Sequence, residues 1–117
     1  MANPLQPKCA KVLEVEYNAF NVIVTSTAKS GVMDILSCIP KDIGTNISDA
    51  KITLGLFYGF EIKWKSDQPS ELQKQKINEV IDAGGRAYFI RSVDELRNIL
   101  NNNIPPIKYE IEKRFKL

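Results

Sequence analysis

The sequence predicts a single α/β domain in which a mixed β-sheet is flanked by helices. Its length of 117 residues is that of one ordinary domain. A hydrophobic content of 44% and a charged content of 26% are typical of a globular chain that buries its own core. The sequence patterns follow the order helix, three strands, helix, strand, helix. Three consecutive strands require hairpins, so the sheet cannot be wholly parallel.

The N-terminal part of the chain predicts a helix and two strands. Residues 5–17 suit a helix, since their apolar positions share one face: Leu5, Cys9, Val12, Leu13 and Tyr17. Residues 19–27 are rich in β-branched side chains and predict a strand. A turn at 29–31 leads to a second strand over 32–39, which Pro40 is expected to close.

A loop and a long strand follow. Residues 40–51 contain many turn-forming and polar residues, which predicts an inserted loop. Residues 51–65 form an apolar and aromatic stretch that predicts a third strand, bent or bulged at Gly55 or Gly59.

The C-terminal part predicts two helices around a short strand. The first helix runs to about Asp82, with a cap from residues 66–68 and Pro69 in its first turn. Residues 83–85 end that helix, and residues 86–91 predict a short strand.

Ser92 and Glu95 have the spacing of a capping box, which predicts a helix that ends near Asn101. The tail, 104–117, alternates apolar and charged residues and could add an edge strand.

Composition excludes several classes of chemistry. The chain has no histidine, which removes the Ser-His-Asp triad and the most common general base. A net charge of +2 is too balanced to indicate nucleic-acid binding by itself. No apolar run is long enough to cross a bilayer, and the N-terminus does not resemble a secretory signal. Cys9 and Cys38 could form one disulfide, but two free thiols in a cytosolic chain are the favoured interpretation.

Two acids and a lysine are the candidate functional residues. Glu61 and Lys63 are two apart on a predicted strand and share a face, while Ile62 points the other way. Alone, this pair is more simply read as a solvated salt pair. Asp34 lies early in an apolar strand, and pairing of the two strands would let Asp34 and Glu61 converge on Mg²⁺ or Mn²⁺. Gln73 lies in the first turns of the next helix, where simple solvation is the default for a glutamine.

An ordered set of motifs resembles a known family. The set comprises Gly31-Val32-Met33-Asp34-Ile35-Leu36, then Glu61-Ile62-Lys63, then Gln73, then Ala83-Gly84-Gly85-Arg86-Ala87-Tyr88. Over about residues 8–100 the chain resembles the VRR-NUC nucleases, a branch of the PD-(D/E)XK restriction-endonuclease-like superfamily. The resemblance implies that 1–117 is a single VRR-NUC-like nuclease domain with an α-β-β-β-α-β core.

The resemblance also implies roles for individual residues. Asp34 and Glu61 match the two metal-binding carboxylates, with the carbonyl of Ile62 as a further ligand. Lys63 matches the lysine that orients or activates the attacking water, and Gln73 matches the glutamine that braces the site. Both acids are expected on an exposed cleft.

Three departures from the family pattern are visible. Met33 replaces the usual proline, and the loop at 40–51 lengthens the separation of the two acids. The family often has a glutamate early in its first helix. Here the first acid is Glu14, later than that position, whereas Asn3 and Gln6 lie nearer.

The resulting hypothesis is a structure-specific DNA endonuclease that depends on Mg²⁺ or Mn²⁺. Branched or flapped DNA is the favoured substrate, as for Holliday-junction resolvases of bacteria or phages, and the expected location is cytoplasmic. A homodimer is expected because several aromatic residues exceed what one small core can cover; they are Phe57, Tyr58, Phe60 and Trp64, with Tyr109 and Phe115 in the tail. One alternative is the same fold binding DNA without cutting it, and another is an unrelated α/β protein with solvated carboxylates.

Overall fold

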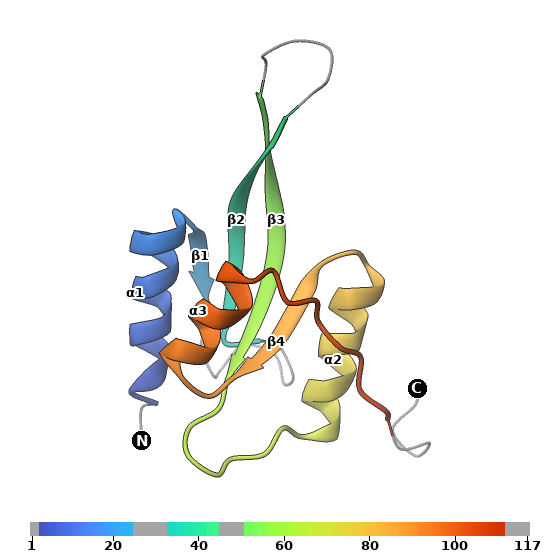
Figure 1. Cartoon of the computed structure of the whole chain (residues 1–117). Coiled ribbons are helices and arrows are strands. Elements are labelled where there is room, and N and C mark those ends of the chain that lie inside the picture. The colour runs from blue at the N-terminus through green and yellow to red at the C-terminus, as the bar shows by residue number, and fades with distance from the viewer. Residues whose placement is uncertain (1–2, 25–32, 45–50, 112–117) are drawn as a thin grey trace.

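The computed structural model describes residues 3–24, 33–44 and 51–111 and places four strands in one sheet with helices on both faces (Figure 1). The elements, in chain order, are α1 (Leu5–Tyr17), β1 (Phe20–Ile23), β2 (Ile35–Gly44), β3 (Lys51–Ile62), α2 (Glu71–Asp82), β4 (Arg86–Ile90) and α3 (Val93–Asn101). This is the order that the sequence predicts. The predicted turn at 29–31 lies outside the described residues.

The sheet has the strand order β1-β2-β3-β4 and is mixed, as predicted. The pairs β1–β2 and β2–β3 are antiparallel, and β3–β4 is parallel. A parallel pair requires a crossover that returns the chain to the same end of the sheet, and α2 forms that crossover. The chain therefore leaves the end of β3 and enters α2 through the segment 63–70, close to the residues that the sequence singles out.

The main core lies between the sheet and the two helices α1 and α3. Alternate strand residues point into it, and α1 contributes Leu5, Cys9 and Leu13, which confirms the predicted helix face. The rings of Tyr58, Phe60 and Tyr88 stack in its centre. Tyr58 and Phe60, which were expected from the sequence at a dimer interface, are therefore buried in the core of this chain.

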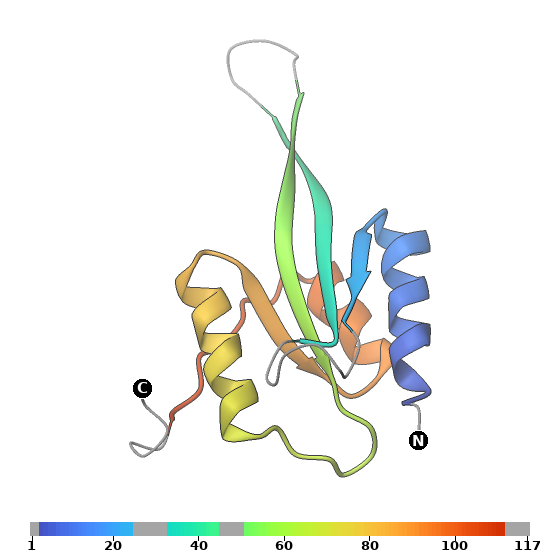
Figure 2. The same cartoon turned by 180° about the vertical axis from the view of Figure 1, so that it is seen from behind.

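The opposite face of the sheet is covered by α2, which lies toward β4 (Figure 2). The buried apolar residues between α2 and this face are Met33, Ile77 and Ala87. On this face Phe20 of β1 pairs with Cys38, which pairs with Phe57 of β3, so the three side chains form a row. All three are exposed, Phe20 to 72% and Phe57 to 49%. We call this row the open sheet face.

The predicted end of the second strand at Pro40 is wrong. The predicted loop 40–51 is also wrong over residues 40–44, which belong to β2. β2 continues to Gly44, in register with β3 down to the pair Gly44 and Lys51. The reason is that β1 pairs with β2 only as far as Cys38. Beyond it one edge of β2 is free, and a proline is tolerated where its missing N–H would face an open edge. Residues 40–44 and 51–55 form an arm that projects beyond the rest of the sheet (Figure 1).

The β2–β3 ladder is continuous through both glycines, so the predicted bulge at Gly55 or Gly59 is wrong. Gly55 and Gly59 both keep their partners in the ladder. They instead make space for side chains of the neighbouring strand, because a Cβ on Gly55 would lie 2.5 Å from the Cys38 sulfur and one on Gly59 would lie 2.6 Å from the Met33 sulfur.

The tail does not form an edge strand within the described residues. After α3 it crosses to α2, where the backbone of Tyr109 exchanges two hydrogen bonds with the Asn78 side chain. Lys108 pairs with Asp82 at 2.7 Å, and Tyr109 packs edge-on against Phe89. The tail as far as Ile111 therefore binds to its own chain through side chains, and residues 112–117 lie outside the described part.

Both cysteines are free, as favoured from the sequence, with Cys9 buried in α1 and Cys38 exposed on β2. None of the helices in the described ranges has the length and hydropathy that a membrane span requires.

Candidate active site at the end of strand β3

The site lies at the C-terminal end of β3, which extends beyond its last pair with β2. The last pair of the ladder joins Ile35 to Phe60, so the final residues of β3 have no β2 residue beside them. Asp34 fills part of this gap, because its Oδ2 accepts a hydrogen bond of 2.8 Å from the Ile62 N–H. Asp34 is itself held by its carbonyl, which accepts from the Val24 N–H at 2.9 Å. The strand pairing thus brings Asp34 to the end of β3 beside Glu61.

Glu61 is buried, with only 4% of its surface exposed. The alternation of β3 turns Phe60 and Ile62 into the main core and Glu61 toward α2, which confirms that Glu61 and Ile62 face opposite ways. The expectation that both acids lie on an exposed cleft is wrong for Glu61, because α2 covers this part of the sheet. Asp34 is half-buried.

Gln73 is fixed by the cap of α2 and holds Glu61. The Ser70 N–H donates to Gln73 Oε1 at 2.9 Å, and Ser70 Oγ accepts from the Gln73 N–H at 3.1 Å. Because Oε1 is occupied by a donor, Nε2 must face Glu61, and it donates to Glu61 Oε1 at 2.6 Å. The predicted cap from residues 66–68 is wrong, since the capping residue is Ser70. Ser70 and Gln73 have the spacing of a capping box, a sequence signal that could have identified this cap.

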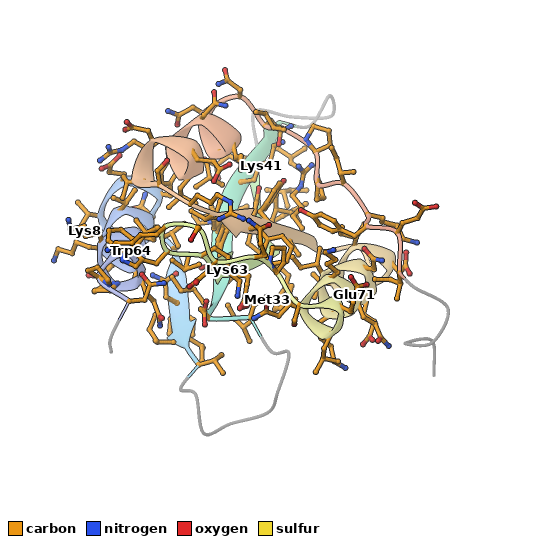
Figure 3. All side chains as sticks on the ribbon, turned by 90° about the horizontal axis from the view of Figure 1, so that it is seen from below. Lys8, Met33, Lys41, Lys63, Trp64 and Glu71 are labelled. Atoms are coloured by element: carbon orange, nitrogen blue, oxygen red, sulfur yellow. The ribbon has the colours of Figure 1, made fainter. Side chains whose placement is uncertain are left out.

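Lys63 projects to the same side as Glu61. Its Nζ lies 3.8 Å from Glu61 Oε1, and its side chain is 13% exposed. The backbone N–H of Lys63 donates to the Ile90 carbonyl at 2.9 Å, so β4 fixes the backbone from which the side chain projects. Figure 3 looks at this end of the sheet and shows Lys63 between Trp64 and Met33 in the view. The structure therefore brings together Asp34, Glu61, Lys63 and Gln73.

The electrostatics of the site favour an added positive charge. Burial, followed by the charge of Asp34, raises the pKa of Glu61 to about 7, although Lys63 acts in the opposite direction. Burial also raises the pKa of Asp34, against the effects of the Ile62 N–H and Lys63. Glu61 Oε2 is buried, and none of the groups in residues 3–24, 33–44 and 51–111 forms a hydrogen bond with it. A buried carboxylate oxygen in this position needs a proton, a water molecule or a cation as its partner.

The donor set fits a hard divalent cation. Two carboxylates and a backbone carbonyl, completed by water, are the oxygen ligands that Mg²⁺ and Mn²⁺ prefer. Over residues 3–24, 33–44 and 51–111 no group of three His, Cys, Asp or Glu side chains converges. Glu14 is exposed on α1 and joins neither Asp34 nor Glu61 in such a group.

One residue at the site was not predicted to have a role. Asn3 donates from Nδ2 to the Ile62 carbonyl at 3.2 Å. The sequence indicated only that Asn3 lies near the position where the family has its early acid, and a contact between residues this far apart in the chain leaves no local pattern.

Comparison with known proteins supports the fold. No protein-family model matches the sequence, and no curated protein does. Among solved structures, the chain is similar to one described as a "VRR_NUC domain", with 15% sequence identity and a TM-score of 0.59. The likeness covers 82% of this chain and 90% of that one. The predicted restriction-endonuclease-like core is thereby confirmed, and the chain has the fold of a VRR_NUC domain.

Proposed function

We propose that this chain is a member of the VRR-NUC nucleases and cleaves DNA as a divalent-metal-dependent endonuclease. The observation that carries the proposal is the buried Glu61 carboxylate beside Asp34 and Lys63, which has one oxygen held by Gln73 and the other without a side-chain or backbone partner among the described residues. A solvated surface salt pair would not be buried and braced in this way. The fold, which is that of a VRR_NUC domain, supports the same conclusion.

The chemistry required is hydrolysis of a phosphodiester bond without a histidine. Asp34, Glu61 and the Ile62 carbonyl would hold Mg²⁺ or Mn²⁺, which supplies Lewis-acid activation of the phosphate and of a bound water. Lys63 places a cation beside the carboxylates, where it can orient the attacking water and stabilise negative charge that develops on the phosphate. Gln73 keeps the Glu61 carboxylate in one orientation.

Within DNA, we propose branched or flapped structures as substrates, with four-way junctions included. The arm extends the two central strands beyond the helices at one end of the sheet, which would add surface for a second duplex of a branched DNA (Figure 1). We further propose that the protein acts in the cytoplasm, where its two free cysteines would stay reduced.

A homodimer remains part of the proposal, with a changed interface. The tail binds to α2 of its own chain, so the open sheet face is the better candidate surface. Exposed aromatic side chains in a row are typical of protein interfaces. Light scattering should give a dimer for the full chain and a monomer for Phe57→Ser, and a chain ending at Asn103 should stay dimeric. A monomeric full chain would contradict this proposal.

One observation favours a second function, which is DNA binding without cleavage. Only two acids converge within the described residues, and the early glutamate of the family pattern has no counterpart beside them. Under this alternative, the site would bind DNA and cut nothing in any divalent cation.

Cleavage assays on linear, flapped and four-way DNA, each with Mg²⁺ and with Mn²⁺, test the proposal. The matched control is Glu61→Gln, which keeps the size of the side chain and removes its charge. We expect cleavage by the wild type, strongest on branched DNA, and none by the control. DNA binding without cleavage would favour the second function. The absence of both would favour an unrelated α/β protein.

A further inference from the structure

The end of β3 is completed by side chains instead of a strand. Both backbone polar groups of Ile62 lie beyond the last β2 pair, and each needs a partner. Asp34 accepts from the N–H at 2.8 Å, and Asn3 donates to the carbonyl at 3.2 Å. Two residues from distant parts of the chain therefore take the places that β2 leaves empty.

Asn3 has a second contact that fixes the orientation of its amide. Its Oδ1 accepts from the Leu5 N–H at 2.9 Å, in the first turn of α1. Since the oxygen is used there, the NH₂ group must face Ile62. The free N–H of Leu5 at the start of α1 explains the oxygen contact, but not why the amide nitrogen reaches the last residue of β3.

The peptide unit that follows Ile62 is held on both sides. Its carbonyl accepts from Asn3, and its N–H, which belongs to Lys63, donates to Ile90. This peptide unit carries the carbonyl proposed as a metal ligand and begins the residue proposed to act on the water. A backbone carbonyl has two lone pairs, so the hydrogen bond from Asn3 leaves one for a cation.

We propose that Asn3 is a positioning residue of the site. It orients the Ile62 carbonyl toward a divalent cation and fixes the backbone from which Lys63 projects. The inference rests on the proposed function, because it assumes that a cation binds to Asp34, Glu61 and Ile62. Partners that orient a metal ligand commonly change metal affinity without touching the metal.

Two substitutions separate this role from the contact of Asn3 with the first turn of α1. Asn3→Ser keeps a side-chain oxygen for the Leu5 N–H but is too short to reach Ile62, whereas Asn3→Ala loses both contacts. Glu14→Gln on the same helix is the matched control, because Glu14 is exposed and lies outside the site. Titration calorimetry with Mn²⁺ gives the dissociation constant, and thermal unfolding without metal gives the melting temperature.

We expect Asn3→Ser and Asn3→Ala to weaken Mn²⁺ binding equally, by roughly tenfold. Only Asn3→Ala should lose melting temperature, by about 5 °C, because only it leaves the Leu5 N–H without a side-chain acceptor. Glu14→Gln should change neither quantity.

Wild-type affinity in Asn3→Ser would overturn the positioning role while leaving the proposed function intact. Loss of affinity in Asn3→Ala alone would also overturn it, since the lost contact with the Leu5 N–H would then be the cause. If the wild type itself binds no Mn²⁺, both the inference and the metal-dependent function are wrong.

Discussion

The two ends of β3 are built in opposite ways. At the arm, every residue from Lys51 to Gly55 pairs with β2, and the side chains are exposed, including Ile52 at 50% and Leu54 at 41%. At the other end, β3 extends beyond its last pair with β2, and the side chains of Asp34 and Asn3 complete the hydrogen bonding of Ile62. The backbone of the arm needs nothing from side chains, whereas the site end depends on them. The same strand therefore carries a tolerant end and a demanding end.

The largest expected effect is the loss of cleavage on changing either acid. Asp34→Asn and Glu61→Gln should each lower the cleavage rate by about three orders of magnitude, because each removes a charge that would hold the metal. Both variants should fold, since removal of one of two neighbouring like charges relieves repulsion. Cleavage rates and melting temperatures measured on the same samples check this. Full activity in either variant would contradict the assignment of the site.

Lys63→Ala should affect the rate more than binding. Its ammonium lies 3.8 Å from Glu61 and is proposed to act on the water and on the developing charge. We expect kcat to fall by about a hundredfold with KM almost unchanged. Lys41→Ala, on the arm, is the matched control and should leave kcat at the wild-type value. A parallel rise in KM for Lys63→Ala would mean that Lys63 is only a phosphate contact.

The stability of the metal-free protein should fall as the pH rises. The folded protein holds the Glu61 proton up to a pKa of about 7, whereas the unfolded chain releases it near 4.5. The folded state therefore binds more protons between these values, and stability drops across that interval by on the order of 3 kcal/mol. Denaturant unfolding at pH 5 and pH 8 measures this drop.

A divalent cation should reverse that loss, because it binds the ionised carboxylates of the folded state. We expect Mg²⁺ to raise the melting temperature more at pH 8 than at pH 5. Glu61→Gln should show a flatter pH dependence and little response to Mg²⁺. Equal pH slopes in the wild type and this variant would show that Glu61 is not the group responsible.

Much of the site could be predicted from the sequence because its pattern is local. Period-two alternation places Glu61 and Lys63 on one face of a strand whatever surrounds it. The bracing role of Gln73 was predicted from the family resemblance, because its own residue type and position favoured simple solvation. The order of elements is local in the same sense, since each element has its own periodicity and turn residues. These are the parts of the prediction that the structure reproduces.

The remainder depended on contacts between distant residues. The burial of Glu61 comes from the packing of α2 on the sheet. The proposed role of Asn3 rests on its contact with Ile62, which joins the start of α1 to the end of β3. Pro40 lies within a strand only because β1 is short and leaves one edge of β2 open. Each of these features depends on residues far away in the sequence, so no local pattern could predict it.

The smallest expected effect comes from two glycines that compare the ends of β3 directly. A Cβ on Gly59 would meet the sulfur of Met33, which is 3% exposed and precedes Asp34, whereas a Cβ on Gly55 would meet the sulfur of Cys38, which is exposed. Gly59→Ala should therefore cost about 1–3 kcal/mol and reduce cleavage, because a buried side chain beside the site must move. In Gly55→Ala the Cys38 side chain can rotate into solvent, so the change should stay within about 0.5 kcal/mol with full cleavage. Denaturant unfolding and cleavage rates of both variants measure the difference. Equal losses in the two variants would mean that the arm is as demanding as the site end.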